Sequence, residues 1–217
     1  MMAVFVLIHG GGSTAWDWHL VKPLLEASGH GVIAVDLPIE DAGAGLEDYT
    51  RAVTAAVGDA QNTIVVGHSL GGFTAPLACH ALRSDGLVYL SAMIPMPGET
   101  FGDWWTNTGH DRESIPEEAF FNLVPEDLAQ QAIGKERDQQ GAWMSAPWPG
   151  RHPHVPTLAI LCRDDLFFPP SFMRRQVRDR LGIEPVEIPG GHYASLSHPE
   201  AVAAALNEFA KEINVGR

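Results

Sequence analysis

The chain has few cysteines, few basic residues and no long apolar run. Only Cys79 and Cys162 occur among its 217 residues. One falls in an expected helix and the other in an expected core strand, so both are predicted to be small buried side chains in a reducing compartment. A disulfide between them is the alternative that the sequence leaves open.

Basic residues are outnumbered by acidic ones. The sequence has 14 Lys and Arg against 27 Asp and Glu, a formal charge of -13. This balance argues against nucleic acid or an anionic membrane surface as a partner, and we expect it to serve solubility. The first apolar run, residues 3–8, is too short to cross a bilayer and lacks the flanks of a leader. We therefore expect a cytoplasmic protein; its oligomeric state stays open, with a homodimer as one option.

Signatures of a bound cofactor or metal are also missing. The loop His9-Gly10-Gly11-Gly12 has neither the Lys-Ser/Thr ending nor the spacing of a phosphate-binding P-loop, and no Gly-x-Gly-x-x-Gly motif occurs. The pair His152-x-His154 lies in a proline-rich stretch with no obvious third ligand. We predict no cofactor and no metal.

Strand-like and helix-like segments alternate along the chain, a pattern typical of a parallel sheet covered by helices. The expected strands are residues 4–8, 32–35, 63–66, 87–90, 157–162 and 186–188. The expected helices are residues 20–27, 47–57, 70–82, 170–181 and 198–213. The predicted fold class is therefore α/β, with a mostly parallel six-stranded sheet and helices on both faces.

This alternation stops between residues 95 and 156, where prolines and aromatics recur and no strand-like run is found. Residues 116–133 carry a helical pattern. We interpret residues 95–156 as an inserted helical cap, and residues 1–94 and 157–217 as the core. Most of the cap aromatics are expected to pack on one another, and the others to line an apolar pocket. The pocket candidates are Trp104, Trp105, Phe120, Phe121 and Trp143, together with Gly10 and His68 of the core.

One motif gives the strongest indication of chemistry. Gly67-His68-Ser69-Leu70-Gly71-Gly72 follows an expected strand and precedes an expected helix. That is the arrangement of a Gly-x-Ser-x-Gly nucleophile elbow, in which a strained turn raises a serine above the sheet. The alternative is an ordinary glycine-rich turn between a strand and a helix.

A nucleophilic serine needs a base and a group that orients the base. His192 follows the last expected strand and two glycines, so it should reach the sheet edge where Ser69 lies. Asp164 and Asp165 both follow the fifth expected strand. We favour Asp165, because it is further past the strand and better placed to turn inward, and Asp164 is the competing candidate. The chain order Ser69, Asp165, His192 is that of an α/β-hydrolase.

An ester hydrolase also needs donors for the oxyanion that forms during the reaction. The backbone N–H of Leu70, directly after the serine, is one candidate. The second is expected in the loop after the first strand, with Gly11 the leading candidate.

With these parts assembled, nearly the whole chain resembles the α/β-hydrolase superfamily. Within it, the chain is most similar to the compact branch of plant methyl-ester esterases and hydroxynitrile lyases. The matching segments are residues 6–12, Trp16, residues 24–31, Asp36-Leu37, residues 66–72 and Gly191-His192. The resemblance implies a triad of Ser69, Asp165 and His192, and oxyanion donors at Gly11 and Leu70. The lyases of this branch place a lysine after the triad histidine, whereas this chain has Tyr193, so a cyanohydrin lyase is not expected.

We therefore expect a serine hydrolase that cleaves a small to medium carboxylic ester, a small-molecule substrate, through an acyl-enzyme. Two other classes stay open. One is a lyase or carbon–carbon hydrolase that uses the same triad. The other is a non-catalytic ligand-binding protein of this fold.

Overall fold

Six strands form one sheet at the centre of the molecule. The computed structural model describes residues 2–215. Its strands are β1 (Val4–Ile8), β2 (Gly31–Val35), β3 (Thr63–His68), β4 (Gly86–Leu90), β5 (Thr157–Cys162) and β6 (Val186–Ile188). Their order is β2-β1-β3-β4-β5-β6, and every neighbouring pair is parallel. The predicted α/β class is confirmed, with a sheet that is wholly parallel.

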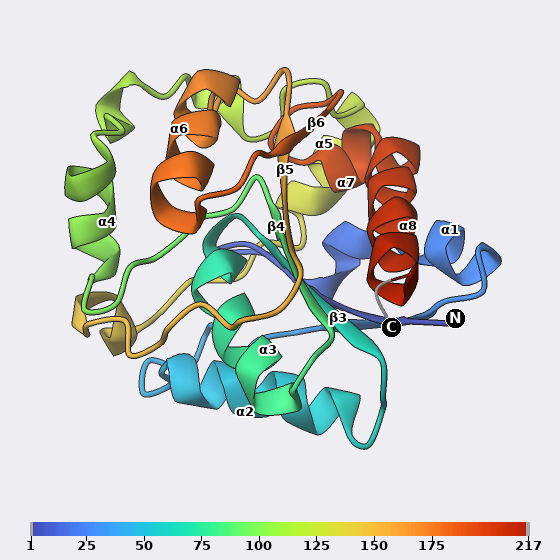
Figure 1. Ribbon diagram of the computed structural model, residues 1–217. Coiled ribbons are helices and arrows are strands. Elements are labelled where there is room, and N and C mark those ends of the chain that lie inside the picture. Colours follow the sequence, from blue (N-terminus) through green and yellow to red (C-terminus); the bar gives the residue numbers. More distant parts are fainter. Residues whose placement is uncertain (1, 216–217) are drawn as a thin grey trace.

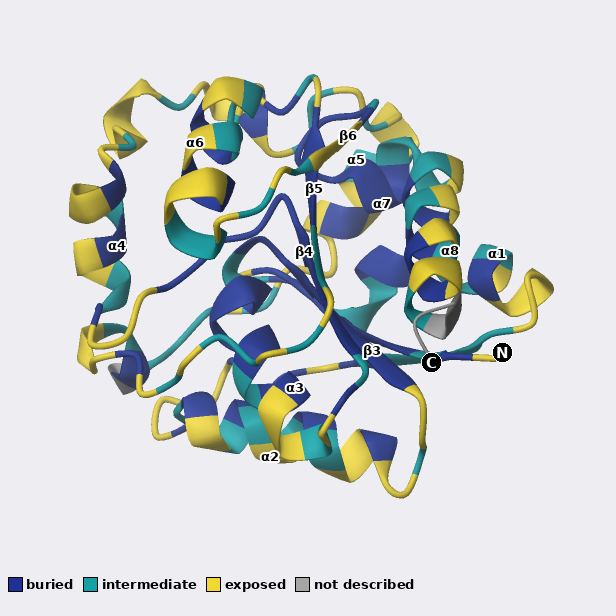
Figure 2. Cartoon of the chain, viewed as in Figure 1, coloured by how far each residue is buried: buried dark blue, intermediate teal, exposed yellow. Residues whose placement is uncertain are grey.

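Alternate side chains of the strands enter two apolar cores, one on each face of the sheet. In β1, Val6 and Ile8 belong to one core and Phe5 and Leu7 to the other. The first face is covered by α2 (Leu46–Val57), α3 (Ala75–Leu82) and α6 (Pro170–Leu181), and the second by α1 (Val21–Ala27) and α8 (Pro199–Val215) (Figure 1). Figure 2 shows that the central strands β3 and β4 are buried and that the helices have their exposed residues on the outside.

The strand order reverses at β1, which has β2 on one side and β3 on the other. In open α/β sheets, sites form at the carboxyl ends of the strands beside such a reversal. The loops that follow β1, β3, β5 and β6 carry Gly11, Ser69, Asp165 and His192, respectively. The topology therefore brings all four to one edge of the sheet.

Between β4 and β5 the chain forms short helices and no strand. These are α4 (Phe101–Thr108), α5 (Glu126–Ile133) and the 3₁₀ turns Arg112–Ser114, Glu117–Ala119 and Ala142–Ser145. The prediction of a helix over residues 116–133 is wrong in its first half, because Pro125 disfavours helix at the residue before it. Helix α4 was not expected, although Thr100 and Asp103 form a capping box at its start. The division into core and cap stays a prediction.

Three smaller features complete the fold. The helix after the serine begins as a 3₁₀ turn, Ser69–Phe73, and becomes α-helical only at Ala75. A short helix, α7 (Ala194–Ser197), follows His192. Cys79 and Cys162 are buried free thiols, and burial raises the pKa of each to about 12. Among the described residues, no helix is both long and apolar enough to cross a membrane.

Candidate active site

Ser69 stands at a strained corner between β3 and the 3₁₀ turn. Its φ of 51° lies in the left-handed region that side-chain-bearing residues rarely adopt. The turn requires glycine around it: a Cβ at Gly67 would lie 2.7 Å from the Cβ of Ala75, and one at Gly71 would lie 2.6 Å from the carbonyl oxygen of His9. The local sequence thus permits a turn that holds the serine hydroxyl above the sheet.

Ser69, His192 and Asp165 form one hydrogen-bonded chain. His192 Nε2 lies 2.9 Å from Ser69 Oγ, and His192 Nδ1 lies 3.0 Å from Asp165 Oδ2. The other carboxylate oxygen, Asp165 Oδ1, accepts the backbone N–H groups of Phe167 and Phe168, each at 2.8 Å. The imidazole is fully buried and the carboxylate nearly so. The acid is therefore fixed in place, and it can orient the imidazole toward the serine.

The side chain of Asp164 points away from these three hydrogen-bonded residues. Its carboxylate contacts Arg163 and accepts the backbone N–H of Gly190 at 3.3 Å. Its backbone carbonyl accepts a bond from Asn122. Of the two competing aspartates, the structure thus brings Asp165 to His192, while Asp164 ties the loop after β5 to the loop after β6.

His68 supports the loop that carries the imidazole. Its Nε2 donates to the backbone carbonyl of His192 at 2.9 Å. Burial is the main cause that lowers the pKa of His68 to about 3, so its ring is neutral. A neutral ring with its proton on Nε2 is the form that can make this bond. His68 thus holds the backbone of His192 in place and does not line the cavity beside Ser69.

A cavity of about 580 Å³ opens beside the serine. Gly11 and Leu70, the two expected oxyanion donors, line it together with Ser69, and a Cβ at Gly11 would lie 2.9 Å from a methyl group of Leu70. Trp105 and Phe120 also line it, as the sequence suggested. The sequence analysis missed the other lining residues, which are Met93, Phe101, Arg112, Ile115, Pro116, Glu117, Gln139, Met144, Phe167 and Tyr193. Of these, Tyr193 directly follows His192 and Phe167 lies two residues after Asp165, and that proximity could have identified them.

Two predicted pocket tryptophans belong to the core instead. Trp104 is completely buried, and its indole N–H donates to the carbonyl of Ile94 at 3.2 Å. Trp143 is buried too, and its indole N–H donates to the hydroxyl of Tyr49 at 3.2 Å. Both side chains therefore pack in the apolar core beneath the cavity, because their indole N–H groups are hydrogen-bonded there.

The pocket assignment is also corrected for Gly10, His68 and Phe121. None of them lines the cavity. Gly10 packs against Ser69, where an added Cβ would come within 3.1 Å of Ser69 Cβ. Phe121 stacks on the outer side of Tyr193, with ring centroids 5.0 Å apart.

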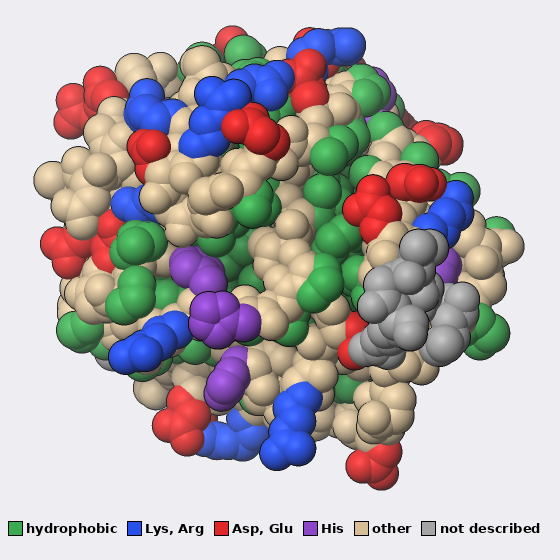
Figure 3. All heavy atoms as spheres, viewed as in Figure 1, with side chains coloured by type: hydrophobic (Ala, Val, Ile, Leu, Met, Phe, Trp, Pro, Cys, Tyr) green, Lys and Arg blue, Asp and Glu red, His purple; other side chains and the backbone are tan. Residues whose placement is uncertain are grey.

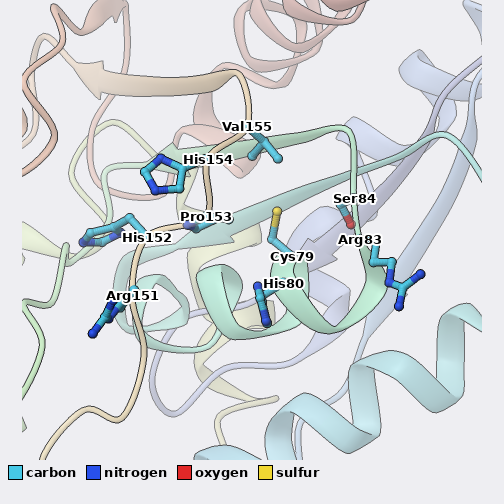
Figure 4. A pocket seen from close by; sticks show the side chains of 9 residues that line it. All are labelled: Cys79, His80, Arg83, Ser84, Arg151, His152, Pro153, His154 and Val155. Atoms are coloured by element: carbon cyan, nitrogen blue, oxygen red, sulfur yellow. The ribbon is translucent and has the colours of Figure 1, made fainter.

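A second hollow, of about 630 Å³, lies at the opposite edge of the sheet, between the end of α3 and the residues that lead into β5. Histidine and arginine side chains gather on this face (Figure 3). Figure 4 shows, however, that Arg83 and Arg151 lie on opposite sides of the hollow and point outward. No cluster of three or more potential metal ligands occurs in residues 2–215. The cationic groups do not converge, so this hollow offers no defined anion or metal site.

Comparisons with known proteins identify the class of enzyme. A family model described as "Alpha/beta hydrolase family" matches residues 5–205. The chain therefore belongs to the α/β-hydrolase family.

The proteins that the chain resembles include a hydrolase and an esterase. The chain is 29% identical to salicylic acid-binding protein 2 of Nicotiana tabacum, over 97% of this chain and 98% of that protein. It is 30% identical to a pyrethroid hydrolase of Sphingobium wenxiniae, over 94% and 86% of the two chains. The crystal structure of polyneuridine aldehyde esterase shares the fold at a TM-score of 0.81, with 24% identity over 97% of this chain and 100% of that one. The family and these relatives make the chain a carboxylic ester hydrolase of the branch that contains the plant esterases.

Proposed function

We propose that this enzyme hydrolyses small to medium carboxylic esters through an acyl-enzyme on Ser69. The observation that carries the proposal is the continuous chain from Asp165 through His192 to Ser69, which ends in a cavity lined by Gly11 and Leu70. An esterase needs these parts together: a nucleophile, an oriented base, and main-chain donors on the side where the oxyanion forms.

In the first half of the proposed reaction, His192 Nδ1–H donates to Asp165, so Nε2 is free to take the proton of the Ser69 hydroxyl. Ser69 Oγ then bonds to the ester carbonyl carbon. The N–H groups of Gly11 and Leu70 stabilise the negative charge on the carbonyl oxygen. Collapse of this intermediate breaks the bond to the alcohol oxygen, which leaves with the proton from His192.

In the second half, a water molecule takes the place of the alcohol. His192 removes its proton, and the resulting hydroxide attacks the acyl carbon. The bond to Ser69 Oγ then breaks, the serine recovers its proton from His192, and the carboxylic acid leaves.

The cavity supports a largely apolar substrate. Its volume is in the range of small-molecule sites. The walls are mainly aromatic and aliphatic, with Phe101, Trp105 and Phe167 among them, and the charged side chains that line the cavity are Arg112 and Glu117, which have opposite charges. We therefore expect esters with an apolar acyl or alcohol part to be turned over better than charged ones.

The test compares Ser69→Ala with Ser28→Ala, a control at the exposed end of α1. Turnover of p-nitrophenyl acetate and butyrate by Ser69→Ala should fall by roughly 10⁴- to 10⁶-fold, with unchanged circular dichroism. A fluorophosphonate should label the unaltered enzyme and Ser28→Ala but not Ser69→Ala. Turnover that survives in folded Ser69→Ala would refute the proposal, as would tight ester binding without turnover in the unaltered enzyme.

A further inference from the structure

Arg137, in the segment between β4 and β5, reaches across the molecule to the loop after β1. Its Nη2 donates to the carbonyl of Ser13 at 2.9 Å, and its Nη1 donates to the carbonyl of Leu37 at 3.0 Å. Nη2 also lies 3.1 Å from His9 Nε2, and the backbone N–H of Arg137 donates to the carbonyl of Gly12 at 2.8 Å. Arg137 therefore holds the glycine loop at three points, His9, Gly12 and Ser13, and ties it to Leu37 in the loop after β2.

These bonds fix the tautomer of His9. A guanidinium only donates hydrogen bonds, and so does the backbone N–H of Leu37, which lies 3.1 Å from the same Nε2. His9 Nε2 must therefore be unprotonated, with the ring proton on Nδ1. Burial, the largest cause, lowers the pKa of His9 to about 4, so the ring is neutral at physiological pH.

The protonated Nδ1 in turn holds the peptide that leads to the cavity. It donates to the carbonyl of Gly10 at 2.7 Å. In a planar trans peptide, the carbonyl and the following N–H point in opposite directions. Anchoring the carbonyl of Gly10 thus sets the direction of the N–H of Gly11, which lines the cavity beside Ser69.

We propose that Arg137 is a positioning residue for the oxyanion hole. It keeps His9 in the Nδ1–H form, and His9 then keeps the peptide between Gly10 and Gly11 turned so that its N–H faces the reacting carbonyl oxygen. Arg137 does not line the cavity, so it acts only through other groups. This inference rests on the proposed function, which makes Gly11 an oxyanion donor.

The geometry also explains why the residue is an arginine. Its two terminal nitrogens bind two different carbonyls at fixed angles, while Asp36 and Glu40 lie 3.7 and 3.9 Å away and balance its charge. A lysine is a single point donor and cannot reproduce this fork. Arg137→Lys should therefore be defective even though it keeps the charge.

The kinetic experiment uses Arg137→Ala and Arg137→Lys, with Arg151→Ala as a control from the same segment. Loss of one oxyanion donor costs about 10²- to 10³-fold in kcat, and we expect a misdirected donor to cost about 10- to 100-fold, with KM changed less than twofold. Affinity for a trifluoromethyl ketone, which forms an oxyanion on the serine, should fall by the same factor. Affinity for the matching methyl ketone should not change, and guanidinium ion should partly restore kcat in Arg137→Ala.

A direct measurement separates positioning from a merely structural role. Nitrogen-15 spectra of the histidine rings, with His9 assigned through His9→Asn, should show the Nδ1–H form in the unaltered enzyme and a tautomer mixture in Arg137→Ala. An Nε2–H ring in the unaltered enzyme would overturn the inference. So would a kcat loss without weaker binding of the trifluoromethyl ketone, or an unchanged kcat in Arg137→Ala. Loss of turnover in Ser69→Ala alongside an unaffected Arg137→Ala would refute only this inference, whereas turnover by Ser69→Ala would refute the proposed function itself.

Discussion

Asp17 should make the enzyme lose stability as the pH rises from about 4 toward neutrality. It lies in the 3₁₀ turn Ala15–Trp18, after the glycine loop that follows β1, is 4% exposed, and its Oδ2 has no hydrogen-bond partner among the described residues. Burial, with Asp36 and Glu136 nearby, raises the pKa of this carboxyl from 3.8 to about 7, although the Ser13 hydroxyl partly offsets the shift. Asp17 thus imposes a folding cost, since its charged form is poorly accommodated.

The sign and size follow from proton linkage. Below pH 3.8 the carboxyl is protonated in both the folded and the unfolded chain, and it contributes nothing. Between pH 3.8 and about 7 only the unfolded chain releases the proton, so stability falls as pH rises. At 1.36 kcal/mol per pKa unit, the full cost above neutrality is about 4 kcal/mol, an upper bound.

Asp17→Asn removes this titration while keeping the shape of the side chain. The amide leaves its own unpartnered polar group, at a cost of about 1–3 kcal/mol that does not depend on pH. The free energy of unfolding of the variant, relative to the unaltered enzyme, should therefore increase by about 3 kcal/mol between pH 5 and pH 8. Urea unfolding followed by tryptophan fluorescence at both pH values measures this difference.

The exposed Asp59, changed to Asn, is the matched control and should show a much smaller change with pH. If the unaltered enzyme and Asp17→Asn lose stability in parallel from pH 5 to pH 8, then Asp17 is not a high-pKa group and the reasoning is refuted.

Three further predictions concern the site and the packing around it. Asp165→Asn should lower kcat by about 10³- to 10⁴-fold with the fold intact. Because two backbone N–H groups hold Oδ1, the new NH₂ group would face the imidazole of His192 and force the wrong tautomer of that ring. Steady-state kinetics at pH 7 tests this. Gly72→Ala should lower Tm by several degrees or prevent folding, since the added Cβ would lie 1.9 Å from a backbone oxygen. Gly102→Ala, in α4, should instead raise stability by about 0.5–1 kcal/mol. Thermal melts of the two variants test both expectations. Arg180→Met should cost about 3–5 kcal/mol in urea unfolding, because it removes the cationic partner of the buried Glu99 carboxylate. The additional change Glu99→Gln should recover part of that loss, and a double variant no more stable than Arg180→Met would contradict this.

The sheet and the residues at its edge could be predicted from the sequence for a physical reason. Strands buried on both faces appear as short apolar runs, and parallel strands all end at the same edge. Ser69, Asp165 and His192 each follow such a run within a few residues. Their meeting was therefore implied by topology, and only the choice between Asp164 and Asp165 depended on the loop conformation.

The inserted segment could not be predicted in the same detail. Trp104 and Trp105 are neighbours in α4, and adjacent helical residues point about 100° apart, so one can line the cavity while the other enters the core. Which one does so depends on how the helix docks, and no periodicity encodes that. The capping box of Thr100 and Asp103 is the local signal that marks the start of α4 in the sequence.

The contacts of Arg137 were beyond sequence reasoning for a further reason. It lies 128 residues from His9, and nothing in its neighbourhood distinguishes it from an exposed arginine. The inserted segment makes two separate sets of contacts. Trp105 and Phe120 shape the apolar cavity, while Arg137 and Gln139 hold the loop after β1, with Gln139 accepting the N–H of Gly12 at 3.3 Å. Because one segment makes both sets of contacts, a change that reshapes the cavity and shifts residues 137–139 would also disturb the proposed oxyanion donor. Substrate preference and catalytic rate are then physically coupled in this enzyme, and they separate only where a change to the cavity leaves the hydrogen bonds of Arg137 intact.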